Sequence, residues 1–166
     1  MPPRFVGLVA VTFMCACAST AATTPPSTVL KANATVLRVV DGDTIHARVA
    51  GRDETIRLIG IDTPETVKPN TPVQCFGEEA SHQTKALLPA GTPIQLVRDA
   101  EARDDYGRLL AYVYRAGDGL FVNLELAEGG FAVPLTIRPN VAHTDEFVAA
   151  ASDAQRAGRG LWAACR

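Results

Sequence analysis

Apolar and polar residues alternate in short stretches along most of the chain after residue 32. Alternation with a period of two is typical of strands that bury one face, and glycine, proline and aspartate favour the turns between such strands. The first three stretches are separated by only a few residues, which predicts an antiparallel meander. The strands that we predict are 33–40, 44–49, 54–61, 94–97 and 109–114.

Three further segments predict helices. The first covers residues 77–88 and stops before Pro89, because proline has no backbone N–H and disrupts a helix that it enters. Asn123 is expected to cap a second helix that ends at Gly129-Gly130, since asparagine favours the start of a helix and glycine its end.

The last predicted helix is capped by Thr144 and stops at Gly158. We expect one apolar face on it, formed by Phe147, Val148, Ala151 and Ala154. Five short strands with a helix between the third and the fourth predict an α+β fold that is mainly β. The architecture that fits is a five-stranded OB-fold Greek-key barrel with three packed helices.

The N-terminal segment differs from the rest of the chain. Arg4 is the first charged residue, an almost wholly apolar stretch follows, and small residues come next, which is typical of a secretory signal peptide. We therefore expect a signal peptide at 1–22, a Thr/Pro-rich linker at 23–32 and one domain at 33–166. The alternative is that this segment forms a strand or helix of the core.

Cys17 leaves two routes of export open. The sequence Met14-Cys15-Ala16-Cys17 loosely resembles a lipobox, in which the cysteine is acylated after cleavage. The protein would then be anchored by lipid at the cell surface; otherwise it would be secreted freely. No apolar run is long enough for a mature membrane-spanning helix.

Two of the four cysteines, Cys75 and Cys165, lie in the predicted domain. Two cysteines in an exported protein favour one disulfide, which would tie the last turn of the chain to the body of the domain. The alternatives are two free thiols or half of a metal site. No C-x-x-C spacing supports zinc.

The charge of the chain limits how it could bind nucleic acid. The chain is 47% apolar and 20% charged, which is typical of a globular protein, and its formal net charge is −2 at pH 7. Proteins whose affinity for nucleic acid comes from a basic surface have the opposite balance. Any phosphate binding must therefore be local, made by a few placed arginines and a cation.

Carboxylates lie at the ends of two predicted strands. Asp43 follows a glycine turn and Asp62 ends a strand, so both side chains can reach one hard cation if the strands are neighbours, and Thr63 could add its carbonyl. Glu65, beyond Pro64, could take a proton from an attacking water. The alternatives are ordinary turn chemistry and a solvated loop carboxylate.

Two arginines complete the candidate chemistry. Arg57 shares a predicted strand face with Ile59 and Ile61, so it needs a partner, either a buried carboxylate or a bound phosphate. Arg108 follows a Tyr-Gly turn just before a strand. Two forked guanidinium groups can hold a phosphate and stabilise the extra charge of a five-coordinate transition state.

These residues resemble the motifs of the staphylococcal nuclease family. The resemblance covers about residues 33–162 and rests on three blocks in order and spacing: Val39 to Thr44, Arg57 to Thr66, and Asp104 to Arg108. It implies an OB-fold and a calcium-dependent endonuclease that cuts DNA and RNA and leaves 3′-phosphate ends.

The resemblance also implies a role for each site residue. Asp43, Asp62 and the carbonyl of Thr63 would hold Ca²⁺, Arg57 and Arg108 would bind the phosphate, and Glu65 would help to activate water. Tyr106 would contact a nucleotide. We expect a monomer that acts on nucleic acid, with single-stranded DNA or RNA favoured.

At three places the sequence departs from the family pattern, and each departure removes residues that would bind substrate. Asp105 stands beside Tyr106 where lysine is expected, and Lys68 is the one lysine in the loop 66–75. The segment 134–138, expected near the start of the third helix, lacks the tyrosines that would stack on a base. This leaves two alternatives to the nuclease: a non-catalytic OB-fold binding lipoprotein, and a protein with a purely structural calcium site.

Overall fold

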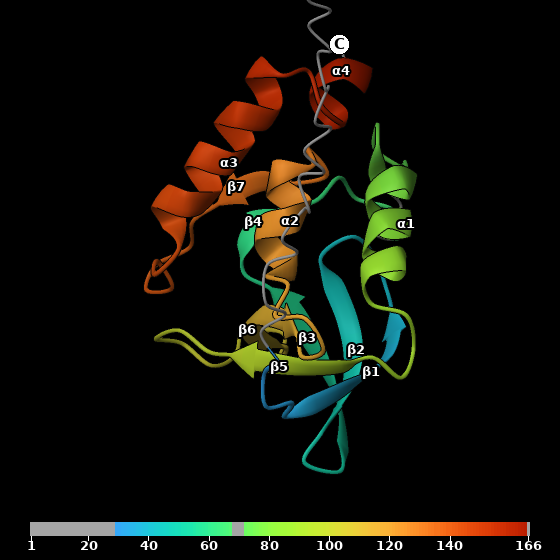
Figure 1. The fold of residues 1–166 in the computed structure, drawn as a ribbon, viewed down its shortest axis with the longest axis vertical. Coiled ribbons are helices and arrows are strands. Elements are labelled where there is room, and N and C mark those ends of the chain that lie inside the picture. Colours follow the sequence, from blue (N-terminus) through green and yellow to red (C-terminus); the bar gives the residue numbers. More distant parts are fainter. Residues whose placement is uncertain (1–28, 68–71, 166) are drawn as a thin grey trace, which may run out of the picture.

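The computed structural model describes residues 29–67 and 72–165 (Figure 1). The predicted signal peptide at 1–22, the lipid attachment at Cys17 and most of the linker lie outside the described residues. Within the described part, none of the helices combines the length and the apolar character that crossing a membrane would need.

Five strands form a closed barrel in the order β1-β2-β3-β6-β5, with β5 pairing back to β1. Strands β3 and β6 run parallel, and the other neighbours are antiparallel. The predicted five-stranded, mainly β barrel is thus confirmed, and Figure 1 shows it in the lower half of the molecule. The strands are β1 (Ala34–Val39), β2 (Thr44–Val49), β3 (Arg52–Leu58), β5 (Pro93–Val97) and β6 (Leu109–Arg115).

The predicted third strand, 54–61, is wrong at its end. Strand β3 stops at Leu58, and Gly60 adopts φ +83°, a conformation that glycine enters without steric cost. A Cβ on Gly60 would lie 2.1 Å from a ring carbon of Phe147, so a side chain does not fit there. The chain continues as β4 (Gly60–Asp62), which pairs with β7 (Val133–Leu135) in a separate two-stranded sheet.

The three predicted helices are present, and the structure adds a short fourth. They are α1 (Gly77–Leu87), α2 (Val122–Glu128), α3 (Thr144–Arg156) and α4 (Leu161–Ala164). The predicted caps are wrong, because Phe121 and His143 occupy the cap positions of α2 and α3 and neither makes a side-chain cap. Val148 was predicted on the apolar face of α3 but is 52% exposed, and Ala150 is buried in its place.

Asn123 is a core residue and not a helix cap. Its side chain is fully buried, its Oδ1 accepts a hydrogen bond from the N–H of Val113 at 2.9 Å, and its Nδ2 donates to the carbonyl of Ile59 at 2.9 Å. Ile59 is the residue between β3 and β4, so Asn123 satisfies the carbonyl that the strand break leaves unpaired. The side chain thereby links α2 to β6 and to the break.

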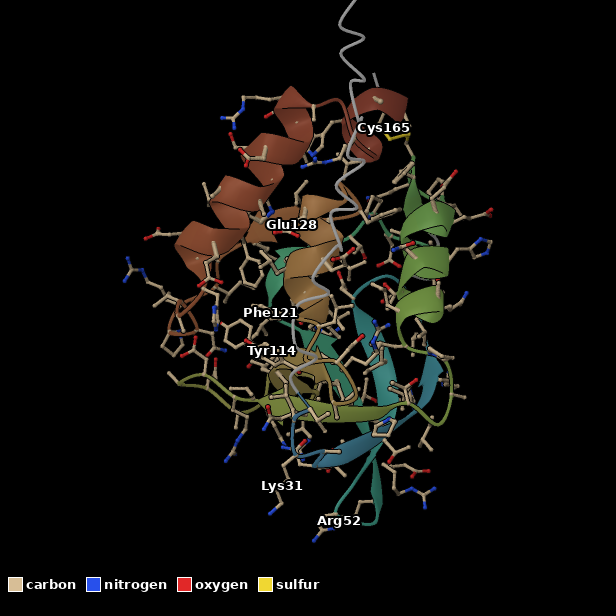
Figure 2. All side chains as sticks on the ribbon, in the orientation of Figure 1. Lys31, Arg52, Tyr114, Phe121, Glu128 and Cys165 are labelled. Carbon is tan, nitrogen blue, oxygen red and sulfur yellow. A yellow bond between two sulfur atoms is a disulfide. The ribbon has the colours of Figure 1, made fainter. Side chains whose placement is uncertain are left out.

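The core continues from the barrel into an aromatic layer under α3. The rings of Tyr114 and Phe121 stack with centroids 4.4 Å apart, and Phe121 lies 5.7 Å from Phe147 of α3 (Figure 2). His143 packs edge-on against Tyr112 at 4.5 Å. Such aromatic contacts add to the stabilisation that burial of the rings already provides, and they hold α3 against the barrel.

A disulfide joins Cys75 to Cys165, 90 residues apart in the sequence, with Cα atoms at 5.9 Å (Figure 2). Cys75 lies two residues before α1 and Cys165 follows α4. The bond therefore fastens the C-terminal segment to the start of α1, next to the chain that leaves β4.

Candidate active site

The turn between β1 and β2 carries Asp43 into the site, and its packing depends on Gly42. A Cβ on Gly42 would lie 2.5 Å from the hydroxyl oxygen of Thr63, so only glycine allows this approach. The hydroxyl of Thr84 in α1 donates to the carbonyl of Gly42 at 2.6 Å. The turn is thus held between the chain that follows β4 and the helix α1.

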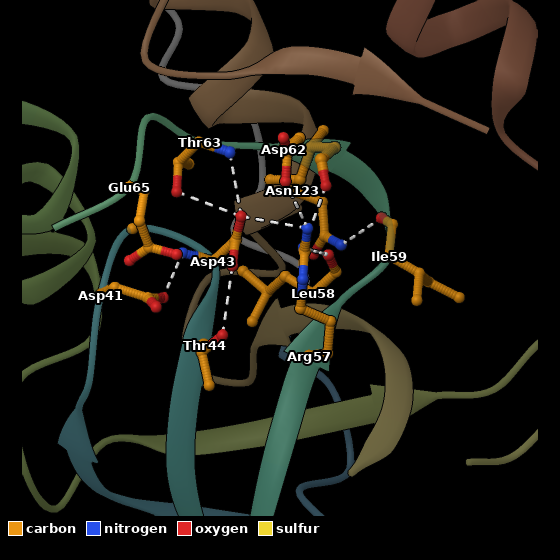
Figure 3. Close-up of polar contacts among 12 residues, drawn as sticks. Asp41, Asp43, Thr44, Arg57, Leu58, Ile59, Asp62, Thr63, Glu65 and Asn123 are labelled. Atoms are coloured by element: carbon orange, nitrogen blue, oxygen red, sulfur yellow. Dashed lines mark hydrogen bonds and ion pairs between the residues drawn. The ribbon is translucent and has the colours of Figure 1, made fainter. Parts of the chain in front are cut away.

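Asp43 is 6% exposed, and its carboxylate is surrounded by donors. Its Oδ2 accepts hydrogen bonds from the backbone N–H and the hydroxyl of Thr63, at 2.9 and 3.1 Å, and its Oδ1 accepts one from the hydroxyl of Thr44 at 3.1 Å (Figure 3). The same Oδ2 lies 3.2 Å from a terminal nitrogen of Arg57. A buried carboxylate needs such partners to remain charged.

Arg57 lies near the end of β3 and is paired with carboxylates, one of the two kinds of partner expected for an arginine on an apolar strand face. Its Nη2 lies 2.7 Å from Asp62 Oδ1 and 3.2 Å from Asp43 Oδ2, so one positive group bridges both carboxylates (Figure 3). Its Nη1 donates to the carbonyls of Leu58 and Ile61, at 2.5 and 3.0 Å. The turn at Gly60 brings these two carbonyls to the guanidinium.

Glu65 lies on the loop beyond Pro64. Its Oε1 accepts hydrogen bonds from the backbone N–H groups of Thr66 and Val67, both at 2.8 Å, which orients the carboxylate. Gln74 makes two hydrogen bonds to the backbone of Glu65. Its side-chain Oε1 accepts from the N–H of Glu65 at 2.9 Å, and its backbone N–H donates to the carbonyl of Glu65 at 2.9 Å. A loop carboxylate with this many contacts is placed by the fold and is not simply solvated.

The second arginine is organised by Asp104. Asp104 Oδ2 accepts a hydrogen bond from Arg108 Nε at 2.6 Å, and its Oδ1 accepts from the N–H groups of Tyr106 and Arg108 at 3.0 and 2.9 Å. Burial opposes the charged form of Asp104, but the bonds from Arg108 outweigh it and hold its pKa below the usual value. Gly107 supplies the positive φ, +78°, that this tight turn needs.

One open cavity of about 590 Å³ brings the predicted site residues together. Tyr106 lies on its rim, 85% exposed, with the Arg108 guanidinium carbon 5.4 Å from its ring centroid. The residues that line the cavity are Asp41, Asp43, Thr44, Arg57, Asp62, Thr63, Glu65, Tyr106 and Arg108.

Two carboxylates of this cavity, Asp41 and Asp62, have raised pKa values. Burial raises the pKa of Asp41 to about 6, and the charges of Asp43 and Glu65 add to this effect. Partial burial also raises the pKa of Asp62; Asp43 and Glu65 add to it, while Arg57 opposes it. Groups that repel one another in this way favour a bound cation, which would relieve the repulsion.

The donor chemistry of the cavity suits a hard cation. Its oxygens come from carboxylates and backbone, which Ca²⁺ prefers, and the bridging nitrogen of Arg57 shows that Asp43 and Asp62 can share one positive charge. Among the described residues, no group of three or more His, Cys, Asp or Glu side chains is gathered for a metal ion. A cation here would therefore rest on the carboxylate pair, a carbonyl and water.

A second cavity of about 350 Å³ shares Arg57, Tyr106 and Arg108 with the first. Apolar side chains line it, namely Ile59, Ile61, Leu110, Leu135 and Ile137, together with the acidic residues Glu101, Asp104 and Asp105. Leu135 belongs to β7, and the segment 134–138 lies near the start of the third helix as expected, because Thr136 is hydrogen-bonded to Thr144, the first residue of α3. Leu135 and Ile137 of this apolar lining lie in the segment where tyrosines that stack on a base would be expected.

Three residues support the site without a role in the sequence patterns. Asp41 accepts a hydrogen bond from the N–H of Asp43 at 3.2 Å, Asp104 organises the Arg108 turn, and Asn123 binds the carbonyl of Ile59. The first two are aspartates whose side chains accept from the N–H group two residues later, Asp41 from Asp43 and Asp104 from Tyr106, a bond that is typical of aspartate in turns. The long-range contact of Asn123 has no local signal.

Comparison with known proteins identifies the group to which the chain belongs. Residues 55–164 match the family model described as staphylococcal nuclease homologue. The chain is 44% identical to the thermonuclease of Staphylococcus hyicus over 127 residues, which is 76% of this chain and 73% of that protein. It is 46% identical to the thermonuclease of Staphylococcus intermedius, again over 76% of this chain and 74% of the relative.

A third relative is the endonuclease YncB of Bacillus subtilis strain 168, which is 41% identical over 131 residues, 78% of this chain and 61% of that protein. Residues 55–164, which the family model matches, contain helices α1 to α4 and both arginines of the cavity. The closed five-stranded barrel is consistent with the OB-fold of this family. The chain belongs to the staphylococcal nuclease family.

Proposed function

We propose that this protein is an exported, Ca²⁺-dependent endonuclease that hydrolyses phosphodiester bonds in DNA or RNA and leaves 3′-phosphate ends. The observation that carries the proposal is that Arg57 and Arg108 line the same cavity as Asp43, Asp62 and Glu65. Relatives named thermonuclease and endonuclease support the reaction class. The fold alone would not support this proposal, because one fold can host many unrelated functions.

The two arginines would bind the scissile phosphate. Guanidinium groups donate forked hydrogen bonds to phosphate oxygens, and they stabilise the charge that develops in a five-coordinate transition state. Asp104 fixes Arg108 through its Nε and its backbone N–H, so this guanidinium is oriented before substrate arrives. Tyr106 would contact a nucleotide from the rim.

Asp43, Asp62 and the carbonyl of Thr63 would hold the Ca²⁺ ion. When bound, the ion would neutralise phosphate charge and orient the attacking water. Thr63 holds Asp43 Oδ2 through both its N–H and its hydroxyl, and this contact between two segments holds Asp43 close to Asp62, which precedes Thr63 in the chain.

Glu65 would accept a proton from the attacking water as the new phosphorus–oxygen bond forms. The bond between phosphorus and the 5′ oxygen would then break, the phosphate would stay on the 3′ oxygen, and the leaving 5′ oxygen would take a proton from solvent. The N–H groups of Thr66 and Val67 orient the Glu65 carboxylate for this task.

Export is supported by the composition of residues 1–22 and by the disulfide between Cys75 and Cys165, since such bonds persist in oxidising compartments. Free secretion and lipid attachment at Cys17 are both compatible with this proposal. The protein would act as a monomer on single-stranded DNA or RNA.

The test is cleavage of single-stranded DNA by the purified protein with millimolar Ca²⁺ or with EGTA. Arg57→Ala and Arg108→Ala should each lower kcat by about 10²–10³-fold, as loss of a transition-state donor does. Arg52→Ala is the matched control, because Arg52 is an exposed arginine on the same strand as Arg57, at the far end of the barrel (Figure 2).

Each outcome separates the alternatives. Cleavage that needs Ca²⁺ and both cavity arginines supports the nuclease, and near-normal rates in both variants would contradict it. Calcium-independent binding of DNA by folded protein without turnover would favour a non-catalytic binding lipoprotein. A purely structural calcium site would show itself if Asp43→Asn lowered the melting temperature without changing any activity.

A further inference from the structure

The backbone of Glu65 is held by Gln74. The side-chain Oε1 of Gln74 accepts the backbone N–H of Glu65 at 2.9 Å, and the backbone N–H of Gln74 donates to the carbonyl of Glu65 at 2.9 Å. Both polar groups of the Glu65 backbone are therefore bound to one partner. This pair fixes where the Cα of Glu65 lies relative to the cavity.

The carboxylate of Glu65 follows its backbone. Its Oε1 accepts from the N–H groups of Thr66 and Val67, so its direction is set by the path of the chain just after residue 65. A shift of that path would turn the carboxylate away from the water that it should deprotonate. Displacement of a reacting group by about 1 Å can lower a rate by about 10²-fold.

Gln74 is in turn held by its own neighbours. The next residue, Cys75, is bound to Cys165, and the N–H of Gly77 donates to the carbonyl of Gln74 at 3.0 Å. A Cβ on Gly77 would lie 3.0 Å from the carbonyl oxygen of Glu65, so the start of α1 packs directly on the backbone of the catalytic loop.

The other end of the disulfide is equally well placed. The N–H of Cys165 donates to the carbonyl of Leu161 at 2.9 Å, and the N–H of Leu161 donates to the carbonyl of Gly130 at 2.9 Å. A Cβ on Gly160 would lie 2.2 Å from the carbonyl oxygen of Gly130, so this contact is backbone on backbone. The C-terminal segment therefore holds Cys165 in place, and through the disulfide it holds Cys75.

The disulfide also lies behind the loop that carries the proposed cation ligands. A small cavity of about 260 Å³ is lined by Asp62, Thr63, Gln74 and both cysteines. Asp62 and Thr63 line the catalytic cavity as well. One face of this loop therefore meets the substrate side, and the other meets the disulfide and Gln74.

We infer that Gln74 is a positioning residue for Glu65, and that the disulfide between Cys75 and Cys165 keeps Gln74 in place. The inference rests on the proposed nuclease activity, in which Glu65 accepts the proton. Activity then depends on the oxidation of two cysteines that never touch the substrate.

Gln74→Ala is the first test, with kcat and KM measured on single-stranded DNA in millimolar Ca²⁺. We expect kcat to fall about tenfold with KM within about twofold, because Glu65 moves while the phosphate-binding arginines stay. Gln74→Glu keeps an oxygen that accepts the Glu65 N–H and should retain most of kcat. Gln155→Ala, at an exposed position of α3, is the control and should match wild type.

A double-mutant cycle separates positioning from general destabilisation. In a Glu65→Gln background, Gln74→Ala should change the residual kcat by less than about twofold. An equal loss of kcat in both backgrounds would overturn the inference, as would a wild-type kcat in Gln74→Ala alone.

Amide hydrogen exchange gives a readout that does not depend on catalysis. Gln74→Ala should speed exchange at Glu65, Thr66 and Val67 while the barrel strands stay protected. Unchanged exchange would overturn the inference. If the wild type cleaves nothing, the proposed function fails, and the exchange at Glu65 still decides whether Gln74 fixes that residue.

The disulfide is tested with Cys75→Ser/Cys165→Ser, after circular dichroism has established that the variant is folded. We expect kcat to fall and the Glu65 amide to exchange faster, and adding Gln74→Ala should cost less than the product of the separate effects. Wild-type kcat and wild-type exchange at Glu65 would overturn the role of the disulfide. If the variant does not fold, kcat and exchange at Glu65 are measured on the wild type with and without a reductant, and values that do not change on reduction would overturn the role of the disulfide.

Discussion

Thr63 donates two hydrogen bonds to the same oxygen of Asp43, one from its backbone N–H at 2.9 Å and one from its hydroxyl at 3.1 Å. The two residues are 20 positions apart, and both are more than nine-tenths buried. Asp43 comes from the turn after β1, and Thr63 follows β4. Their contact is therefore the joint at which the two carboxylate-bearing segments become one site.

This joint depends on the absence of a side chain at Gly42, because a Cβ there would lie 2.5–2.8 Å from three atoms of Thr63. We expect Gly42→Ala to push Thr63 away from Asp43, to lower stability by about 1–3 kcal/mol and to lower kcat at least tenfold. Urea unfolding and cleavage kinetics measure the two effects. Gly117→Ala, where a Cβ meets no atom within 4 Å, should leave both unchanged; equal behaviour of the two variants would contradict this account.

Asn123 is expected to matter for stability because its partners are buried. Asn123→Ala would leave the N–H of Val113 and the carbonyl of Ile59 without their side-chain partner, and we expect a loss of about 2–4 kcal/mol in urea unfolding. Asn33 offers a matched control, since it binds Leu96 through the same pair of amide atoms but is exposed. Asn33→Ala should cost less than about 1 kcal/mol, because water can replace its bonds. Equal losses would show that burial is not the cause.

The fold was largely predictable because its signals are local. Period-two alternation marks the strands, and Pro89 and Gly158 mark helix ends, each through its own backbone chemistry. The break between β3 and β4 escaped the pattern, since Ile59 and Ile61 continue the alternation across Gly60. At the break, Gly60 packs directly against the ring of Phe147, 87 residues later in the chain, and no local rule contains this contact.

The residues of the candidate site could be predicted from the sequence, but the residues that hold them in place could not. Aspartate, glutamate and arginine near turns are visible in the sequence, and one cavity gathers them. The partners that hold them are a different matter. Asn123 resembles a helix cap when only its neighbours are considered, and Gln74 lies in a polar loop with no pattern of its own. Their roles arise from contacts between segments that only the folded chain brings together.

Asp99 should make the stability of the protein sensitive to acid. Its Oδ2 accepts from the N–H of Ala142 and the hydroxyl of Tyr112, both at 2.9 Å, and its Oδ1 accepts from the N–H of Ala100 at 2.9 Å. The bond from Ala142 is the largest cause that holds the pKa of Asp99 below its usual value, and partial burial opposes it.

Because this pKa is lower in the folded than in the unfolded chain, the stabilisation is complete above the unfolded value, about 3.9, and is lost as the pH falls through the folded value. We expect Asp99→Asn to lower stability by about 1–3 kcal/mol at pH 7 and to converge with wild type as the pH falls through the folded pKa. Urea unfolding between pH 7 and pH 3 measures the difference. Tyr112→Phe, which removes one of the three donors, should show a smaller part of the same trend, and a gap that stays constant with pH would rule out the ionised carboxylate as the cause.

The carboxylate of Asp105 should weaken the binding of nucleic acid without affecting the rate of the chemical step. It lines the second cavity beside Arg57 and Arg108, and Glu101 and Asp104 add acidic groups there, so a polyanionic substrate meets repulsion at this edge. We expect Asp105→Lys to lower KM for single-stranded DNA about three- to tenfold at low salt, with kcat unchanged, and to lose most of this gain at high salt because the interaction is screened.

Asp53→Lys is the matched control, because it makes the same change of charge in the exposed β3 residue next to Arg52, at the far end of the barrel. An improvement of KM in Asp105→Lys but not in Asp53→Lys would assign the repulsion to this edge of the site. If both variants gained equally, the effect would come from net charge, and the acidic rim of the second cavity would have no part in substrate affinity.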